Sequence, residues 1–280
     1  MARTSSARVA TTQRYSLAEG IIWDDRAGEA VWVDIDGGDL VRNLEVPVAL
    51  HLDTTVGAVA LAEDGGYLVA GRSALIAVAP DGSVSRGPDL IDPAEARLND
   101  GTVDPQGRFL VGTVSLGEHV NQQLLRISPN GSVEVLRTGI TLSNGLVFTA
   151  DGTLLHVDTF GKTISALRDG AWVTVLDSFT GYPDGITVDS DDRVWVAQYG
   201  AAMVQRFTLD GELLETVEIG TSEATCVGFI GADLGMLAIT SGREEATDDL
   251  AGAIFVADVD ATGAPENRWA GSTSAPYWTI

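Results

Sequence analysis

The sequence has few of the residues from which covalent and histidine-based sites are built. Among 280 residues there is one cysteine, Cys226, so an internal disulfide and a thiolate metal cluster are both excluded. The three histidines, His51, His119 and His156, lie far apart in the sequence without metal-ligand spacing. Nothing in the sequence therefore supports a histidine-built zinc site or a Ser-His-Asp triad.

Positive charge is also scarce. The chain has 17 Lys and Arg residues against 40 Asp and Glu residues, a net charge of −23. Such a charge repels phosphate backbones and anionic membrane surfaces, so we expect no nucleic-acid partner and no membrane partner. The negative charge attracts cations. Its alternative explanation is solubility, or adaptation to a salty environment.

Long apolar segments are missing as well. No stretch approaches the ~18 consecutive apolar residues of a membrane span. The N-terminal "MARTSSARVATTQRYS" contains basic residues but no apolar core of an export signal. We therefore expect a cytoplasmic protein. With 45% hydrophobic residues the chain can still bury a full core.

Helical periodicity is absent, and one phrase recurs in its place: a small residue, an alternating strand, a polar turn and a second strand rich in Val, Leu and Trp. The starts of consecutive copies are 37, 44, 44, 40 and 41 residues apart, which suits about four short strands per unit. The six copies start at Gly20, Gly57, Gly101, Gly145, Gly185 and Cys226.

These repeats predict an all-β protein, a six-bladed β-propeller with four-stranded antiparallel blades around a central channel. Residues 1–280 would form one domain, with the repeats over about 16–258. Residues 7–15 could pair with the last blade near 252–259 and close the ring. The tail, about 264–280, could pack outside the blades, and the sequence assigns it no place.

The position just before each copy carries a carboxylate or amide side chain in four of six repeats. In a propeller the first strand of each blade lines the channel, so equivalent repeat positions form a ring around the axis. Converging carboxylate and amide oxygens are what a hard cation such as Ca²⁺ requires. The six residues are Glu19, Val56, Asp100, Asn144, Asp184 and Thr225.

Asp184 belongs to an Asp-Gly pair, which elsewhere in a sequence usually marks a turn. Asp184, however, precedes an inner strand and shares the register of Glu19, which is not a turn residue, so a ligand role is favoured over a turn. The same reasoning applies to Asn144, whereas in "ARLNDGTVD" either Asn99 or Asp100 could face the axis. The mid-repeat turn pairs are Asp81-Gly82, Asn130-Gly131, Asp151-Gly152 and Asp210-Gly211.

Four motifs in order carry a resemblance to a known family. "AEGIIWD", "RLNDGTVDPQGRFLVGT", "SNGLVFTADG" and "PDGITVDSDDRVWVA" resemble the Glu-Gly, Arg-x-Asn-Asp-Gly, Ser-Asn-Gly and Pro-Asp-Gly signatures of the senescence-marker-protein / gluconolactonase / luciferin-regenerating family of six-bladed propellers. The resemblance extends from about residue 16 to 258.

The resemblance implies one divalent metal ion on the channel axis, held by Glu19, Asn144 and Asp184, with Asn99 as a further ligand or a substrate contact. It also implies that Arg97 contacts substrate oxygens and that Asp184 is the candidate general base. The oxygen-rich ligand set favours Ca²⁺, with Zn²⁺, Mn²⁺ and Mg²⁺ as alternatives.

The chain departs from the family pattern at two positions. Ile21 replaces the proline that usually follows the first Glu-Gly, which could alter the loop of the first blade. The acidic residue that binds substrate hydroxyls in family members is shifted: Gly117 occupies its place and Glu118 follows one residue later. We therefore treat Glu118 as a candidate substrate contact, and Tyr199 as a residue that could reach the channel mouth.

Together these features predict a metal-dependent hydrolase that opens a lactone, a small-molecule substrate, to its hydroxy acid. One alternative is a phosphotriesterase or other esterase on the same metal site, differing in the loops near 72–76, 115–123 and 198–203. Another is a calcium-stabilised binding propeller without catalysis, although a purely structural ion needs no arginine beside it. We expect a monomer or a weak homo-oligomer.

Overall fold

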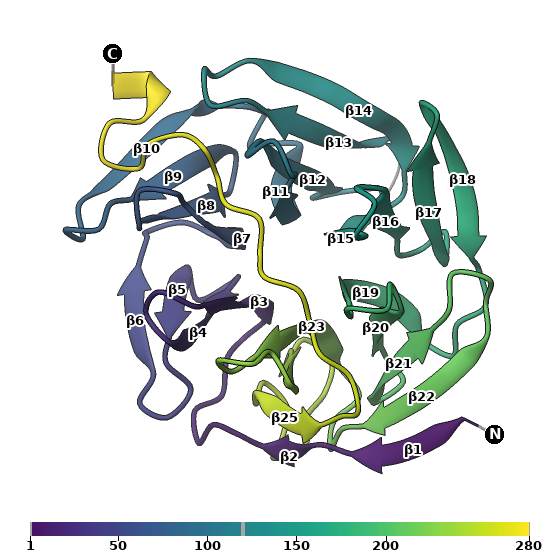
Figure 1. The fold of residues 1–280 in the computed structure, drawn as a ribbon. Coiled ribbons are helices and arrows are strands. Elements are labelled where there is room, and N and C mark those ends of the chain that lie inside the picture. The colour runs from purple at the N-terminus through teal and green to yellow at the C-terminus, as the bar shows by residue number, and fades with distance from the viewer. Residues whose placement is uncertain (1, 119–120, 280) are drawn as a thin grey trace.

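Six β-sheets form a ring around a central channel (Figure 1). The computed structural model describes residues 2–118 and 121–279, so His119 lies outside the described residues. Each sheet contains four antiparallel strands, one sheet gains a fifth strand from the N-terminal residues, and the first strand of each repeat is the innermost. The predicted six-bladed β-propeller is thereby confirmed.

The blades follow one another along the chain, and their strands have these bounds. Blade 1 contains β3 (Ala18–Asp24), β4 (Glu29–Asp34), β5 (Asp39–Arg42) and β6 (Val48–His51). Blade 2 contains β7 (Val56–Leu61), β8 (Tyr67–Gly71), β9 (Ala74–Val78) and β10 (Val84–Asp89). Blade 3 contains β11 (Ala96–Val103), β12 (Phe109–Ser115), β13 (Gln122–Ile127) and β14 (Val133–Ile140).

The second half of the ring repeats this order. Blade 4 contains β15 (Ser143–Phe148), β16 (Leu154–Asp158), β17 (Thr163–Arg168) and β18 (Ala171–Leu176). Blade 5 contains β19 (Tyr182–Val188), β20 (Val194–Tyr199), β21 (Met203–Phe207) and β22 (Leu213–Glu218). Blade 6 contains β23 (Ala224–Ile230), β24 (Met236–Ser241) and β25 (Phe255–Asp258).

The hydrophobic core lies between the blades. Strands β7, β8 and β9 are buried along their whole length, because each inner blade face packs on its neighbour, whereas the outer strand β14 is largely exposed. Of the five largest side chains with almost no exposed surface, Trp32, Phe109, Trp195 and Phe255 come from four different blades, and Trp269 comes from the C-terminal residues. Core packing therefore holds the inner strands at fixed positions around the channel.

The N-terminal residues close the ring, as the sequence predicts. Strand β2 (Arg8–Val9) pairs antiparallel with β25, with Arg8 opposite Val256, and so supplies the fourth strand of blade 6. Strand β1 (Arg3–Ser6) adds a fifth strand to blade 5 by pairing parallel with β22, which the repeat pattern does not predict. The N-terminus thus joins two blades at their outer edges.

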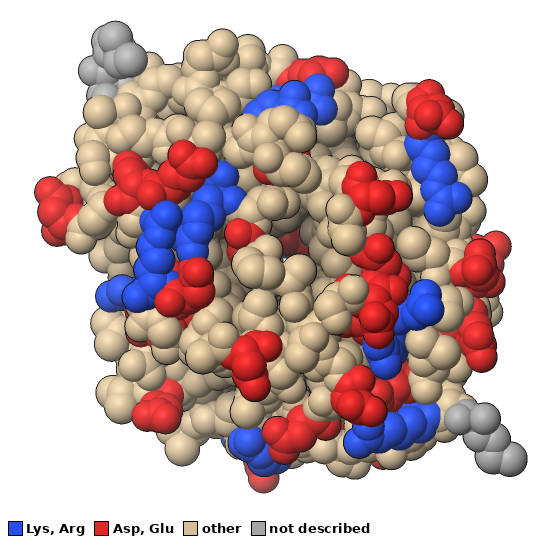
Figure 2. All heavy atoms as spheres, viewed as in Figure 1, with Lys and Arg blue, Asp and Glu red and all other residues tan. Residues whose placement is uncertain are grey.

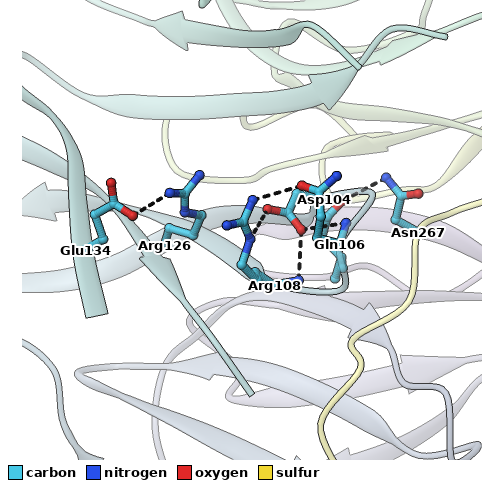
Figure 3. A network of polar contacts seen from close by, with 7 residues as sticks. Asp104, Gln106, Arg108, Arg126, Glu134 and Asn267 are labelled. Atoms are coloured by element: carbon cyan, nitrogen blue, oxygen red, sulfur yellow. Dashed lines mark hydrogen bonds and ion pairs between the residues drawn. The ribbon is translucent and has the colours of Figure 1, made fainter. Parts of the chain in front are cut away.

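The C-terminal residues cross one face of the propeller as a strap, defined here as residues 260–279 (Figure 1). Trp269 exchanges backbone hydrogen bonds with blade 2 and is 1% exposed. Asn267 Nδ2 donates to the carbonyl of Val103 at 2.9 Å, beside the paired side chains of Asp104 and Arg108 (Figure 3). The short 3-10 helix η1 (Tyr277–Thr279) follows. The tail is therefore an integral part of the fold.

The strap contacts the ends of inner strands β7, β11 and β19, so it lies on the face where the inner strands end. Figure 2 shows that acidic and basic side chains are interspersed over this face, which is hollowed near its centre. Across the described residues, no helix has the length and apolar character needed to cross a membrane.

Candidate functional site

The site forms at the opposite end of the inner strands, where they begin. In every blade the pairing of the first strand with the second is interrupted at this end by a β-bulge. Bulges re-aim side chains and recur near active sites. The interruptions lie between Glu19 and Ile22, Val56 and Ala58, Leu98 and Gly101, Ser143 and Leu146, Pro183 and Ile186, and Ala224 and Val227.

A cavity of about 700 Å³ opens on this end of the channel, a size that suits a small-molecule ligand. It brings together six of the seven predicted site residues. Glu118 is exposed and lines a separate hollow on blade 3, so the structure does not bring it to the axis. The six residues that line the cavity are Glu19, Arg97, Asn99, Asn144, Asp184 and Tyr199.

Asn99 and Asp100 both lie within the bulge of β11 and line different cavities. Asn99 lines the open cavity, and its Nδ2 donates to Asn144 Oδ1 at 2.7 Å and to the carbonyl of Ser143 at 2.9 Å. Asp100 lines a smaller cavity of about 50 Å³ farther along the channel. Arg97 donates to Asn99 Oδ1 at 2.5 Å, which ties the guanidinium to the axial amides.

Two carboxylates meet in this cavity without sufficient positive charge around them. Burial, followed by the charges of Asp184 and Asp100, raises the pKa of Glu19 well above its usual value. Burial also raises the pKa of Asp184, together with the charges of Asp100 and Glu244, while Arg97 and a hydrogen bond from Asn144 oppose the shift. The carboxylate form of this pair is therefore destabilised unless a cation binds beside it.

The amides are held in place by buried polar partners. Asn144 Nδ2 donates to Thr159 Oγ1 at 3.0 Å, and that hydroxyl donates to the carbonyl of Pro183 at 2.9 Å. Because its nitrogen is occupied, the Asn144 oxygen is presented on the side of Asn99 and the cavity. These bonds connect blades 3, 4 and 5 around the axis.

A buried histidine supports the same strand from behind. His156 is inaccessible to solvent, and its Nε2 lies 2.7 Å from Ser143 Oγ, while Arg137 Nη1 donates to its Nδ1 at 3.0 Å. Since the arginine always donates, Nε2 carries the proton and donates to the serine. Burial and the nearby Arg137 lower the pKa of His156 to about 3, so the ring is neutral.

The glycine after each of two site residues allows neighbouring inner strands to approach. A Cβ at Gly145 would lie 2.5 Å from the carbonyl oxygen of Asp184, and one at Gly185 would lie 2.7 Å from the Cα of Cys226. Neither glycine has a positive φ. The Asn-Gly and Asp-Gly pairs at these positions thus serve close packing around the axis and not chain reversal.

The donor set fits a hard cation. Among the described residues no group of three His, Cys, Asp or Glu side chains is arranged to hold a metal, and the convergent donors are two carboxylates and two amides. Asp184 Oδ1 is buried and has no hydrogen-bond partner in the described chain, a costly state for a carboxylate oxygen. A cation bound there would satisfy this oxygen and neutralise the paired carboxylates.

Several cavity residues were not predicted from the sequence. They come from the last residue of a second strand, at Ser115, or from the segments that follow second strands. These parts reach the same face because the first two strands of a blade are antiparallel. Their position could have been inferred from the sequence, because the second strand of each blade is recognisable in the repeat. The residues are Ile35, Ser115, Thr159, Phe160, Glu244 and Glu245, with Tyr182 at the start of β19.

Fold and site together define a six-bladed β-propeller with a buried ring of oxygen donors on its axis. The family model described as "SMP-30/Gluconolactonase/LRE-like region" matches residues 17–243, and the chain belongs to this family. The resemblance stated from the four motifs is confirmed.

Sequence relatives include the pentonolactonase XacC of Haloferax volcanii, 30% identical over 90% of this chain and 94% of that protein. A 6-deoxy-6-sulfogluconolactonase of Pseudomonas putida is 32% identical over 91% of this chain and 95% of that protein. Among solved structures, a calcium-binding protein, regucalcin, of Agrobacterium tumefaciens is 25% identical and superposes with a TM-score of 0.89, covering 96% of this chain and 99% of that one.

Proposed function

We propose that this protein is a metal-dependent hydrolase that opens a lactone, either a sugar lactone or another small cyclic ester, to its hydroxy acid. The observation that carries the proposal is the pair of buried carboxylates, Glu19 and Asp184, beside the axial amides and one arginine in a ligand-sized cavity. The lactonase names of two relatives and the calcium-binding structural neighbour support it.

Glu19, Asn144 and Asp184 would hold one divalent cation, with Asn99 as a further ligand or a substrate contact. Bound there, the cation supplies Lewis acidity that polarises the lactone carbonyl. The oxygen donors favour Ca²⁺ over Zn²⁺, Mn²⁺ or Mg²⁺.

The residues of the chain then divide the remaining tasks. Arg97 orients the ester oxygens or hydroxyls of the substrate through its planar set of donors. Asp184 accepts a proton from the water that attacks the carbonyl carbon. The ring C–O bond breaks, the alkoxide oxygen is protonated, and a hydroxy acid leaves.

The test is acid release from a panel of pentono-, hexono- and aliphatic lactones by protein stripped with a chelator and resupplied with single divalent cations. We expect turnover to return with one or more cations and to be absent in Asp184→Ala. If a cation raises the melting temperature of the wild type but no lactone opens, the hydrolase proposal fails. The series of single cations would then be repeated with phosphotriesters in place of lactones.

A further inference from the structure

The loop after β24 places two glutamates in the axial cavity. Glu223 is 1% exposed, and its carboxylate accepts hydrogen bonds from the backbone N–H groups of Glu244 at 2.9 Å and Glu245 at 2.6 Å. The loop backbone is thus anchored on a buried anion, while the side chains of Glu244 and Glu245 line the cavity. The anchoring gives these two carboxylates a defined position.

Glu244 lies within electrostatic range of the reacting groups. Its charge acts on the guanidinium of Arg97 and raises the pKa of Asp184. The pKa of Glu244 is itself raised by burial and by Asp36 and Glu223, with Arg97 opposing the shift. Glu244 therefore lines the same cavity as the arginine that would orient the substrate, near enough for the two charges to interact.

The two glutamates decide the sign of the charge in the cavity. The charged lining residues are four carboxylates and one guanidinium, so a divalent cation on the axis leaves a net charge of −1. Without Glu244 and Glu245 the same cavity and cation would carry +1. Lys162 lies over the ring of Tyr182, a lining residue, but its own side chain is not part of the lining.

Blade 6 thus places an acidic group in the axial cavity, whereas the candidate on blade 3 lies outside it. Glu118, the sequence candidate for binding substrate hydroxyls, lines a different hollow. A carboxylate accepts hydrogen bonds from hydroxyl groups, and such charge-assisted bonds are stronger than neutral ones.

From this arrangement we infer that Glu244, assisted by Glu245, makes the site selective for uncharged, polyhydroxylated lactones. Glu244 accepts hydrogen bonds from substrate hydroxyls, and the two charges together exclude lactones that carry a sulfonate, phosphate or carboxylate group. The inference rests on the proposed function, because it names the substrate class of the same site. The hydroxy acid product is an anion, so the same charges also disfavour its retention.

The kinetic test compares three lactones near neutral pH with cation-loaded protein: D-glucono-1,5-lactone, its 6-deoxy-6-sulfo analogue and δ-valerolactone. We expect wild type to prefer the uncharged sugar lactone. In Glu244→Gln, kcat/KM for the sugar lactone should fall about tenfold while that for δ-valerolactone is little changed, because only the sugar offers hydroxyls. In Glu244→Gln/Glu245→Gln, the ratio of kcat/KM for sulfonated to uncharged lactone should rise at least about tenfold, less at high salt.

Two further variants separate this assignment from its alternatives. Glu212→Gln removes one negative charge from an exposed turn of blade 5 and should leave all three substrates unaffected. Glu118→Gln tests the position indicated by the family pattern. If Glu118→Gln lowers kcat/KM for the sugar lactone selectively and Glu244→Gln does not, or if the double variant leaves the ratio unchanged, the inference is overturned.

A binding measurement keeps the outcome independent of turnover. Calorimetric titration with 1,5-anhydro-D-glucitol and with its 6-phosphate should show tighter binding of the uncharged compound to wild type, and loss of that preference in the double variant. If no lactone is hydrolysed but this preference appears, the proposed function fails and the selectivity stands. If the phosphate binds wild type equally well, the selectivity fails whatever the activity.

Discussion

The same dipeptide occurs in two regions of this molecule with opposite physical consequences. At the outer turns, Asp151 Oδ1 accepts the backbone N–H of Thr153 at 2.9 Å, Gly152 has a φ of 84°, and hydrogen bonds from Thr149 and Thr153 lower the pKa of Asp151 to about 2. On the inner strand β19, Gly185 has no positive φ, and burial raises the pKa of Asp184. Position in the repeat, and not the Asp-Gly pair itself, determines whether the aspartate shapes a turn or lines the axial cavity.

The sharpest test of this contrast replaces both aspartates by asparagine. Asp184→Asn should lower kcat for lactone opening by about 10³-fold, because it removes a negative ligand and the proposed base. Asp151→Asn should leave the rate within about twofold, since an asparagine oxygen accepts the same turn hydrogen bond. Steady-state kinetics of cation-loaded variants measures both, and equal losses would remove the distinction.

The two glycines differ in the same way. Gly185→Ala should lower the free energy of unfolding by about 3 kcal/mol, because its Cβ would lie 2.7 Å from the Cα of Cys226 on the neighbouring strand. At Gly152 no atom lies within 4 Å of an added Cβ, so alanine there meets only the left-handed backbone, which costs about 1 kcal/mol. Denaturant unfolding of both variants provides the comparison; a larger loss at Gly152 would contradict it.

The contribution of the buried His156 to stability can be measured from the pH dependence of the free energy of unfolding. Its pKa is about 3 when folded against 6.5 for the free side chain, so the unfolded chain binds the proton first and stability is lost as pH falls below 6.5. Lowering the pH to about 5 should remove about 2 kcal/mol from wild type.

Arg137 is the charged group that faces this ring and keeps it neutral. His156→Gln should lack this part of the pH dependence, although its stability at neutral pH is lower. Urea unfolding of both proteins at neutral pH and at about pH 5 measures this difference. If the free energy of unfolding falls equally with pH in wild type and variant, His156 does not titrate on unfolding.

The smallest expected effect distinguishes an axial arginine from a peripheral one. Arg97→Lys keeps the charge but loses the planar donors, so KM for a lactone should rise about tenfold with a smaller change in kcat. Arg86, in an exposed ion pair with Asp89, is the matched control, and Arg86→Lys should change neither constant. A fall in kcat alone for Arg97→Lys would argue against an orienting role.

The periodic features were predictable from the sequence, whereas the irregular ones were not. Repeat spacing predicts the six blades, the ring position of Glu19, Asn144 and Asp184, and the pairing of residues 7–15 with the last blade. Strand alternation alone cannot determine which of Asn99 and Asp100 faces the open cavity, because both lie within a bulge that shifts the register.

Other parts of the molecule depend on tertiary contacts without a local pattern. The loop with Glu244 and Glu245 is positioned by the buried carboxylate of Glu223, a bond that no spacing rule anticipates. The strap is held by Trp269 and by Asn267, and the parallel pairing of β1 has no counterpart in the other blades.

Closure of blade 6 by β2 also has a consequence for the kinetics of folding. Arg8 pairs with Val256, so this contact joins segments separated by nearly the whole sequence. Contacts of such separation require a large entropic loss before they form, and proteins rich in them fold slowly. We therefore expect the ring to close late in folding and, once closed, to lose its blades together, so that no intermediate with a partial set of blades accumulates on unfolding.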